Sequence, residues 1–450
     1  MAPSANTYPT SPASAEAAAR HKGEQNVDLT GQALEHMSHA NGDGDAAAAA
    51  AAAAANGHTL TPAKGGPREL DASALTYEFT TQPRPVPADI ATACAGTETI
   101  CTDHMVTVAW DADRGWAAPA LRPYGPLSLM PTASVLHYAT ECFEGLKVYR
   151  GVDGRLRLFR PDCNAQRMLT SAVRIALPAF APAELEKLIV ALLAVDGPKW
   201  LPRDGPPDAY LYLRPTMIGT QPQLGVQAPR EALLYVTACF LPRLDAVPGG
   251  LRLHTSPEDM VRAWVGGFGY AKVGANYGPS LLATKEARAR GCHQILWLYG
   301  PEGYCTEAGA SNFFVLWQPR PNPATGTVGK PQLITAPLDD RLILNGVTRR
   351  SIVQLARERL AGEIEVVERR YTIAEVQEAH AEGRLLEAFA AGTAYFVTPV
   401  SLIHHRGQDV PFPMETEMGG KYTRQLKKMI SEIMYGQTEH PWGVVIPERE

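Results

Sequence analysis

Short apolar runs and alternating apolar positions recur along the chain beyond residue 70, separated by turn residues. Runs of roughly four to eight residues rich in β-branched and aromatic side chains predict strands, and apolar positions three and four apart predict helices. In the first half of the chain, strands are expected at Val106–Trp110, Ser134–Tyr138, Leu146–Arg150, Leu156–Phe159, Ala209–Ile218 and Ala232–Phe240. Two amphipathic helices are expected at Arg167–Ala176 and Pro182–Val195. Residues 71–241 are therefore predicted to form a small α+β domain.

The pattern breaks at residues 242–250, which contain Pro242, Pro248 and a glycine pair. Such a cluster of turn residues predicts a linker between two domains. Beyond it, strands are expected at Gln294–Tyr299 and Asn312–Trp317, and helices at Pro279–Arg290, Ser351–Leu360, Ile373–Glu382 and Lys421–Met434. Residues 251–450 are therefore predicted to form a larger α+β domain, since 450 residues are too many for one hydrophobic core.

Residues 1–70 differ in composition from the rest of the chain. They are rich in Ala, Ser, Thr, Gly and Pro and contain the alanine run Ala46–Ala55. A segment with so little bulky apolar surface does not offset its ordering entropy, so this tail is predicted to be disordered. A transit peptide should be rich in arginine and poor in acids, whereas Arg20 and Lys22 lie among acidic residues. The expected compartment is therefore the cytoplasm, with the mitochondrion as the alternative left open.

The composition and charge argue against several classes of protein. The chain is 45% hydrophobic and 20% charged, with a formal net charge of −5. This balance gives no global attraction to nucleic acid or anionic membranes, and no apolar run approaches the roughly 20 residues that span a bilayer. The seven cysteines form no C-x-x-C, and the adjacent pair His404-His405 would point to opposite faces of a strand. We therefore expect a soluble protein in a reducing compartment, with no metal, nucleic-acid or membrane partner.

The stretch from Arg262 to Gly278 is the most informative part of the sequence. It contains Lys272 among glycines and apolar residues, with no acidic residue within ten positions on either side. A lysine in an apolar site without a carboxylate partner is a usable amine nucleophile, although on spacing alone a solvated lysine on a glycine-rich loop is commoner. A nucleotide-binding loop does not fit, because Lys272 is followed by Val273 rather than Ser or Thr and the glycines do not form G-x-G-x-x-G.

Several separated segments resemble the motifs of the branched-chain-amino-acid aminotransferases, a family of fold-type IV enzymes that use pyridoxal 5′-phosphate (PLP). Besides the stretch around Lys272, these segments are His137–Lys147, Tyr212–Pro215, Leu296–Gly300, Thr306–Asn312, Gly392–Ala394, Tyr435-Gly436 and His440–Trp442. The resemblance covers roughly residues 80–445, and several motifs in this order are far more specific than any one of them. It implies a two-domain α+β fold of the D-amino-acid aminotransferase type and a transaminase activity.

The resemblance implies roles for three residues around the reactive ring of the cofactor. Lys272 resembles the Schiff-base lysine, which also shuttles a proton during the reaction. Glu307 resembles the acid that faces the pyridine nitrogen and keeps it protonated, so that the ring accepts electrons. Tyr277 resembles the phenol that hydrogen-bonds the cofactor's 3′-oxygen. Without the resemblance, Glu307 would as readily be a solvated acid and Tyr277 a core tyrosine.

Five residues match the family's phosphate-binding positions. Arg167 and Arg262 would supply charge-assisted hydrogen bonds. Val347 and Thr348 would offer backbone N–H groups at the start of a helix, where anions bind readily. Thr393 would add its hydroxyl and its own N–H. Without the resemblance, a surface salt bridge would be the more usual role of either arginine.

The resemblance also implies a substrate pocket and a homodimer. The pocket residues are Tyr138, Phe143, Tyr212, Arg214, Thr393 and Ala394, the last two through backbone groups. Leu224 and Val226 match positions that the family takes from a neighbouring subunit. Apolar walls with a few fixed polar groups suit leucine, isoleucine and valine side chains. The implied reaction moves the amino group of a branched-chain L-amino acid to 2-oxoglutarate, giving the branched 2-oxo acid and glutamate.

The chain departs from the family at three places. Tyr395–Thr398 stands where animal members carry a C-x-x-C, so thiol regulation is not expected there. Ala310 removes a hydroxyl common near the phosphate, and Ala246 and Val247 stand where an aromatic residue often closes the pocket. These departures leave open another amino or 2-oxo acid as substrate of the same fold. A catalytically silent scaffold is a further alternative, disfavoured by the joint presence of the lysine, tyrosine, glutamate and arginines.

Overall fold

A computed structural model describes residues 66–206, 209–242, 247–394 and 396–449. Residues 1–65 of the tail predicted to be disordered, residues 243–246 of the predicted linker (Ala246 included) and Tyr395 lie outside the described residues. Of the helices within the described ranges, none is both long enough and apolar enough to cross a membrane.

The first part of the chain builds a mainly antiparallel sheet that also takes in the last strand. Over the described ranges its strand order is β1-β4-β2-β9-β8-β6-β7-β19, with β3 beside β2 and β5 beside β8. The strands are β1 (Thr76–Tyr77), β2 (Cys101–Asp111), β3 (Gly115–Trp116), β4 (Ala120–Pro123), β5 (Glu141–Phe143), β6 (Leu146–Arg150), β7 (Leu156–Phe159), β8 (Tyr210–Gly219), β9 (Glu231–Cys239) and β19 (Gly443–Val445). β1 and β4 pair in parallel at one edge, whereas the strands around β8 are all antiparallel.

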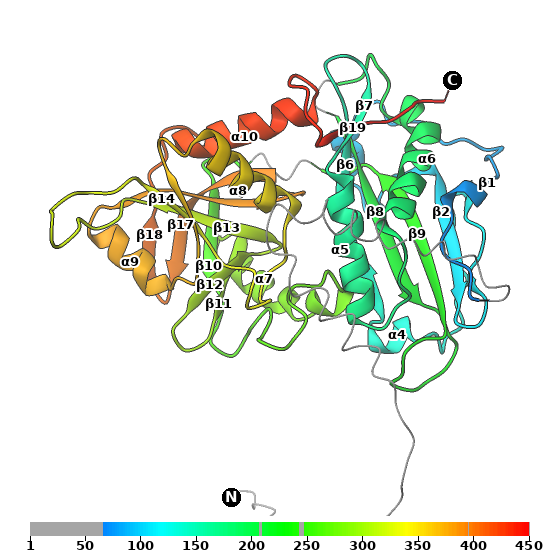
Figure 1. Cartoon of the computed structure of the whole chain (residues 1–450), viewed down its shortest axis with the longest axis horizontal. Coiled ribbons are helices and arrows are strands. Elements are labelled where there is room, and N and C mark those ends of the chain that lie inside the picture. Colours follow the sequence, from blue (N-terminus) through cyan, green and yellow to red (C-terminus); the bar gives the residue numbers. More distant parts are fainter. Residues whose placement is uncertain (1–65, 207–208, 243–246, 395, 450) are drawn as a thin grey trace, which may run out of the picture. The chain divides into compact units, whose positions relative to one another are not determined.

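Two helices, α5 (Pro161–Arg174) and α6 (Pro182–Trp200), pack together on this sheet (Figure 1). Leu211 and Leu213 of β8 are fully buried in the core that these helices complete. Because successive side chains of a strand point to opposite faces, Tyr212 and Arg214 point away from that core. Tyr210, on the same face of β8, shares a second core with residues of the other sheet. The face that carries Tyr212 and Arg214 is thus the one turned toward the second part of the chain.

The second part of the chain builds a sheet that closes on itself. Its order in the described residues is β12-β11-β10-β17-β16-β13-β14-β15, with β18 beside β17 and with β12 also paired to β13. The strands are β10 (Leu251–Thr255), β11 (Gln294–Tyr299), β12 (Tyr304–Ala308), β13 (Ser311–Trp317), β14 (Gln332–Thr335), β15 (Glu365–Glu368), β16 (Leu385–Gly392), β17 (Phe396–His405) and β18 (Gln408–Pro411). Since β12 pairs with both β11 and β13, the strands from β12 to β13 form a ring filled by apolar side chains such as Leu253, Phe313 and Ile403.

Helices cover the outside of this ring and border the first sheet. They are α7 (Ser280–Ala289), α8 (Val347–Arg359), α9 (Ile373–Ala381) and α10 (Lys421–Met434), and shorter helical segments are η1 (Ala72–Ala74), α3 (Ile90–Cys94), α4 (Val135–Tyr138) and η2 (Gly274–Asn276). α8 and α10 pack against Phe314 and Phe389, in a core that includes Phe159 of the first sheet. The buried Glu387 of β16 accepts hydrogen bonds from the backbone N–H groups of Tyr422 and Thr423 at 2.9 and 2.8 Å, which caps the start of α10.

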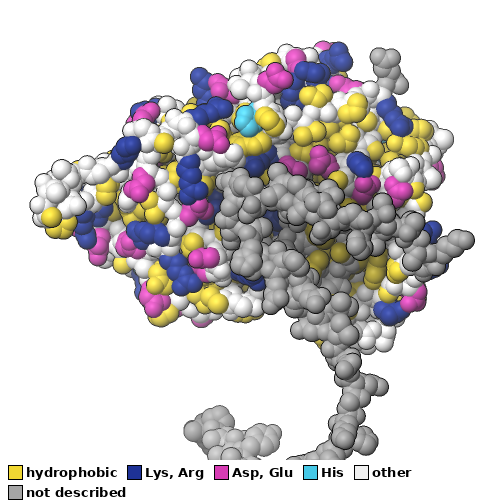
Figure 2. Space-filling view, in the orientation of Figure 1, with side chains coloured by type: hydrophobic (Ala, Val, Ile, Leu, Met, Phe, Trp, Pro, Cys, Tyr) yellow, Lys and Arg dark blue, Asp and Glu magenta, His cyan; other side chains and the backbone are white. Residues whose placement is uncertain are grey.

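The visible surface carries mixed charge. Figure 2 shows Lys and Arg side chains interspersed with Asp and Glu side chains over the face that it presents. An interspersed surface lacks the single-sign field that draws nucleic acid to a protein. The face in view is therefore mixed rather than basic.

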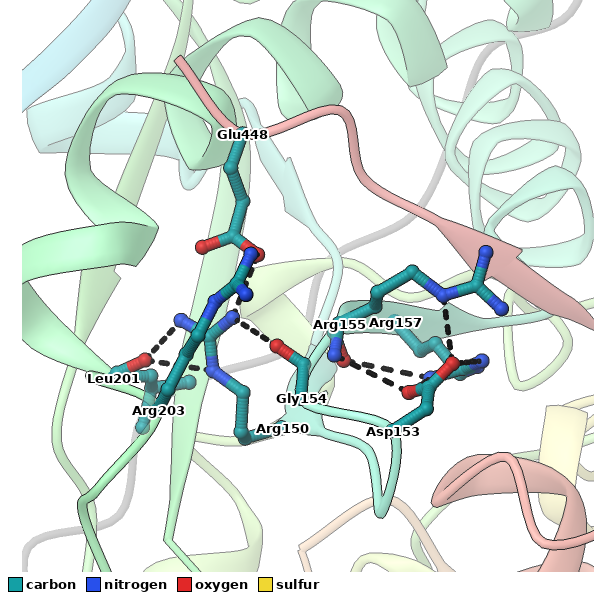
Figure 3. Close-up of polar contacts among 8 residues, drawn as sticks. All are labelled: Arg150, Asp153, Gly154, Arg155, Arg157, Leu201, Arg203 and Glu448. Carbon is teal, nitrogen blue, oxygen red and sulfur yellow. Dashed lines mark hydrogen bonds and ion pairs between the residues drawn. The ribbon is translucent and has the colours of Figure 1, made fainter. Parts of the chain in front are cut away.

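The C-terminal segment returns to the first sheet (Figure 3). β19 pairs with β7, and the buried Arg150 of β6 donates hydrogen bonds to the Glu448 carboxylate and to the Gly154 carbonyl oxygen. Arg157 of β7 pairs with Asp153 in the neighbouring turn. The Arg157 guanidinium holds the pKa of the Asp153 carboxyl well below its usual range. Residues 443–448 thus belong to the first sheet in space, and the boundaries 71–241 and 251–450 stay a prediction.

One predicted strand is wrong. Ser134–Tyr138 forms the short helix α4, which ends at Ala139 in the left-handed conformation, with a φ of 49°. Leu136 is 58% exposed, so the alternating apolar residues do not mark a buried strand face. A stretch of only five residues is too short for its apolar pattern to distinguish a strand from a helix. The turn at Ala139 is what favours the short helix. By contrast, the predicted Leu146–Arg150, Leu156–Phe159, Gln294–Tyr299 and Lys421–Met434 are confirmed residue for residue.

Candidate active site

A cavity of about 480 Å³ is lined by residues from both sheets. The lining comprises Glu141, Phe143, Gly145, Arg167, Tyr212, Arg214, Lys272, Gly274, Tyr277, Glu307, Ala310, Asn312, Leu344, Gly346, Val347, Ala391, Gly392, Thr393 and Ala394. A hollow of about 550 Å³ lies elsewhere, between α6 and residues 447–449, and its one lysine, Lys187, is held by Glu184 at 2.6 Å. The first cavity is therefore the candidate site, because it gathers most of the predicted residues.

The backbone of Lys272 is fixed on both sides. Its N–H donates to the Ser171 hydroxyl at 2.8 Å, and its carbonyl oxygen accepts from the Phe143 N–H at 3.0 Å. Its Nζ lies 3.1 Å from the Tyr277 hydroxyl and 4.8 Å from the centre of the Phe143 ring. Among the described residues no carboxylate lies within ion-pairing distance of this amine, and Lys272 is the one lysine in the lining. The side chain is therefore placed to act as an amine in the cavity.

Glu307 presents a buried carboxylate to the same cavity. It lies on β12, opposite Asn312 of β13, and is 1% exposed. Its Oε1 accepts hydrogen bonds from the Leu344 N–H and the Asn312 amide, both at 3.1 Å. Its Oε2 lies 2.6 Å from Arg262 Nε but accepts no hydrogen bond within the described ranges. Burial raises the pKa of the Glu307 carboxyl, and the charge of Arg262 opposes that shift. Oε2 is thus ion-paired with Arg262 but still has hydrogen-bonding capacity for an N–H donor.

Arg262 lies behind Glu307 rather than in the cavity wall. Besides the ion pair with Glu307, its guanidinium donates to the carbonyl oxygens of Leu342 and Gly269, at 3.1 and 3.4 Å. These contacts engage the Arg262 guanidinium with other groups of the protein. Its predicted place at the phosphate stays a prediction, and the contacts give it a role that the sequence did not indicate, that of holding the acid.

Arg167 lines the cavity and forms an ion pair with Glu144 that was not predicted from the sequence. Its Nε and Nη2 lie 2.6 and 2.8 Å from the two carboxylate oxygens of Glu144, which is fully buried. Burial alone would raise the pKa of Glu144, but the charge and hydrogen bonds of Arg167 lower it below its ordinary value. Arg167 Nη1 also donates to the Asn345 carbonyl oxygen at 3.2 Å. The sequence carried a signal for this, because Glu144 lies inside the motif His137–Lys147.

The N-terminus of α8 lines the same cavity as Arg167. Its N-cap residue, Gly346, has no capping side chain, and the first N–H groups of a helix have no partner within the helix. Val347 and Thr393 line the main cavity. Thr348, which is 3% exposed, lies with both of them at a smaller adjoining hollow. The predicted phosphate residues other than Arg262 are thus brought together.

The side of the cavity formed by the first sheet carries Phe143, Tyr212 and Arg214. Arg214 Nη2 donates to the Tyr212 hydroxyl at 3.2 Å, and its guanidinium lies 4.7 Å from the centre of the Phe143 ring. The buried Arg214 Nε has no hydrogen-bond partner in the described part of the chain. Ala394 reaches the same cavity just beyond the end of β16. This wall thus combines aromatic rings with one cation, Arg214, and one acid, Glu141 of β5.

Three predicted pocket residues lie outside the lining. Tyr138 is 39% exposed at the end of α4, and Leu224 and Val226 are 59% and 91% exposed. Their positions on the surface of the chain leave them available to another copy. Separately, His404 contacts Asp409 and His405 contacts Thr255, so the adjacent histidines take different partners, and no group of metal-binding side chains occurs within the described ranges.

Comparisons with known proteins decide the family. The family model described as amino-transferase class IV matches residues 141–403. The mitochondrial branched-chain-amino-acid aminotransferase of Schizosaccharomyces pombe is 42% identical over 388 residues, which cover 85% of this chain and 87% of the relative. The cytosolic enzyme of Mus musculus is 44% identical, over 77% of this chain and 86% of the relative.

The chain belongs to the branched-chain-amino-acid aminotransferase family. Solved structures agree with this assignment. The branched-chain aminotransferase of Thermoproteus uzoniensis with norvaline superposes with a TM-score of 0.58 and 25% identity, over 76% of this chain and 99% of that chain. The T.th. branched-chain amino acid aminotransferase complexed with N-(5′-phosphopyridoxyl)-L-glutamate gives 0.55 and 27%, over 75% and 98%. The predicted α+β fold of type IV is therefore confirmed, and this branched-chain aminotransferase is an enzyme of a family that uses PLP.

Proposed function

We propose that this branched-chain aminotransferase holds PLP on Lys272 and transfers the amino group of leucine, isoleucine or valine to 2-oxoglutarate. The observation that carries the proposal is the presence of Lys272, Tyr277 and Glu307 in one cavity beside Arg167 and the start of α8. Among the structural neighbours, the T.th. enzyme binds a phosphopyridoxyl adduct of glutamate and, in another complex, the branched apolar 4-methylvaleric acid. Both kinds of side chain therefore suit a site of this family.

The residues present fit the cofactor. Its phosphate matches the uncapped N-terminus of α8 with Arg167, Val347, Thr348 and Thr393. Its protonated ring nitrogen matches the buried carboxylate of Glu307, whose Oε2 accepts no hydrogen bond in the described part of the chain. When bound, PLP supplies an electron-accepting ring for the pair released from the substrate Cα–H bond.

The protein's own groups then have distinct tasks. The Lys272 amine takes the proton from the substrate Cα, and the Tyr277 hydroxyl 3.1 Å away orients that amine. Glu307 holds a negative charge near the ring nitrogen, and Arg262 anchors the carboxylate. Phe143 and Tyr212 exclude water from the apolar side chain of the substrate, and the backbone of Thr393 and Ala394 meets the substrate carboxylate.

Arg214 is assigned to the second substrate. A purely apolar pocket would leave the distal carboxylate of 2-oxoglutarate desolvated and unpaired, at a cost of several kcal/mol. The Arg214 guanidinium, with its unpartnered Nε and the Tyr212 hydroxyl beside it, supplies the cation that this carboxylate needs.

Arg214→Gln is expected to lower kcat/KM for glutamate roughly 10- to 100-fold while lowering it much less for leucine, since one charge-assisted contact contributes about 1.5–3 kcal/mol. The measurement is the rate of each half-reaction, with Arg203→Gln as a control because Arg203 is exposed and does not line the cavity. Equal losses for both substrates would show that Arg214 supports the fold or the cofactor instead.

We also propose a homodimer in which Leu224 and Val226 of one subunit close the pocket of the other. Both side chains are exposed on the single chain, at 59% and 91%. Val226→Asp is expected to weaken the dimer or raise KM for leucine, because a carboxylate would be desolvated in an apolar wall. Sedimentation of the wild type and the variant checks the assembly. A monomeric, fully active wild type would contradict this proposal.

The compartment is proposed to be the cytoplasm. The family's curated members include both mitochondrial and cytosolic enzymes, so membership does not decide between them. Imaging of the full chain with a C-terminal fluorescent tag tests the proposal.

A further inference from the structure

Glu141 is an acid in the cavity wall that the proposed mechanism does not use. It opens β5, pairs with Ile218 of β8 and lines the same cavity as Arg214 and Lys272. Its carboxylate lies against Gly274, where a Cβ atom would come within 2.1 Å of Glu141 Oε2. A Cβ atom at position 274 would force this carboxylate to move, so the glycine allows it to lie beside the Lys272 segment.

The carboxylate of Glu141 has no hydrogen bond or ion pair in the described part of the chain. Burial raises its pKa, and the charge of Arg214 opposes this rise from beyond ion-pairing distance. The other acid of the described lining differs, since Glu307 is paired with Arg262, and Glu144, outside the lining, is paired with Arg167. Glu141 is thus the acid of this wall whose charge is left without a direct partner.

The charged and titratable groups around Glu141 come from each neighbouring element. They are Arg214 on β8, Tyr235 on β9, Arg167 on α5, Lys272 and Tyr277 on either side of η2, and Cys142 and Glu144 on its own segment. Arg167 is neutralised by Glu144, and burial raises the pKa of both the Tyr235 hydroxyl and the Cys142 thiol, which keeps them neutral. Of these cations, Arg214 is the one whose charge acts on the Glu141 carboxyl, so it is the cation that Glu141 shares with any substrate carboxylate.

A dicarboxylate in this pocket brings a second negative charge to Arg214, next to Glu141. Two carboxylates that share a site cannot both stay ionised without a large cost, so the arriving charge raises the pKa of the acid already there. Leucine brings no such charge. The two substrates of each catalytic cycle thus differ in what they require of Glu141.

We propose that Glu141 determines the response of the enzyme to dicarboxylate substrates. It takes up one proton from solvent when glutamate or 2-oxoglutarate binds at Arg214. Its neutral carboxyl group then donates a hydrogen bond to the distal carboxylate of the substrate. The inference rests on the proposed function, in which Arg214 receives that carboxylate. No other bond is formed or broken in this step.

Proton uptake on binding tests the proposal without turnover. Binding of glutarate and of 4-methylvalerate to the PLP-loaded enzyme is measured by calorimetry near neutral pH in buffers of different ionisation enthalpy. Glutarate is expected to take up close to one proton more than 4-methylvalerate in the wild type, and this difference is expected to vanish in Glu141→Gln. Glutarate binding without extra proton uptake by the wild type overturns this inference alone. An enzyme that turns over leucine but does not bind glutarate overturns the dicarboxylate role of Arg214 as well.

The pH profile gives a second readout. The ratio of kcat/KM for glutamate to that for leucine cancels the titration of groups common to both half-reactions. Because the neutral form of Glu141 is required, this ratio is expected to fall with rising pH, by up to about tenfold for each pH unit above the pKa of Glu141 in the free enzyme, the slope that uptake of one proton requires. In Glu141→Gln the ratio is expected to be flat.

Glu186→Gln is the matched control for both experiments. Burial also raises the pKa of Glu186, but this half-buried glutamate lies on α6, outside the cavity. Its substitution is expected to leave the wild-type pH profile of the ratio unchanged. A ratio that is flat in the wild type, or one that falls equally in wild type and Glu141→Gln, would overturn the role of Glu141.

Discussion

Lys272→Ala is expected to abolish transamination in both directions. Lys272 is the one lysine in the described lining of the cavity, and its backbone is held by Ser171 and Phe143. General acid–base catalysis alone contributes roughly 10²–10⁴-fold, and the loss of covalent attachment adds to this. We expect a loss of at least about 10⁴-fold in the rate of the leucine half-reaction, together with loss of the near-visible absorbance of lysine-bound PLP.

The matched control is Lys285→Ala, on the exposed side of α7 near the same segment. It is expected to keep the wild-type rate and spectrum. The phosphate-binding groups remain in Lys272→Ala, so the variant is still expected to hold PLP, but loosely and without a covalent bond. Residual activity within about tenfold of the wild type would rule out Lys272 as the amine that moves the proton.

Glu307→Gln is expected to lower the transamination rate by orders of magnitude while PLP stays bound. Glutamine preserves the size of the side chain and an acceptor oxygen for the Leu344 N–H, but it carries no negative charge to stabilise a protonated ring nitrogen. A shift of one unit in the pKa of that nitrogen corresponds to about 1.4 kcal/mol. Removing a buried charge in contact with it is therefore expected to lower the transamination rate by about 10²-fold or more.

The measurement is the single-turnover rate with leucine, and cofactor content is checked by absorbance after denaturation. Glu302→Gln, a change at an exposed glutamate in the turn before β12, is the control and is expected to be silent. A rate within a few-fold of the wild type in Glu307→Gln, with full cofactor content, would refute the role of this acid.

The local pattern of apolar residues correctly predicted the strands and helices in which a single periodicity continues without interruption. The strand Leu146–Arg150 and the helix Lys421–Met434 are of this kind, and their bounds agree with the structure. The pattern failed at β16 and β17, which were not predicted. β16 reads Leu-Leu-Glu-Ala-Phe-Ala-Ala-Gly, a composition typical of a helix, and it becomes a strand because it pairs with β13 and β17 in the closed ring. Such pairing between distant segments leaves no local signal.

In the candidate site, too, some features could be predicted from the sequence and others could not. The spacing around Lys272 marked it as unusual, but on its own it favoured a solvated lysine, and the resemblance to a family was needed to assign the chemistry. The contacts of Glu144 with Arg167 and of Arg262 with Glu307 join residues 23 and 45 positions apart, so only the fold shows which acid holds which arginine. Glu141 drew no attention in the sequence because its neighbours Arg214 and Gly274 come from other elements.

Peptide mass mapping after borohydride reduction, with and without leucine, shows directly which lysine carries the cofactor. Reduction fixes a phosphopyridoxyl group to whichever amine carries it. We expect this mass on the peptide that contains Lys272 in the resting enzyme, and its loss from that peptide when leucine is added before the reductant. A phosphopyridoxyl group on any other lysine, or one on Lys272 that leucine does not displace, would contradict the role of Lys272.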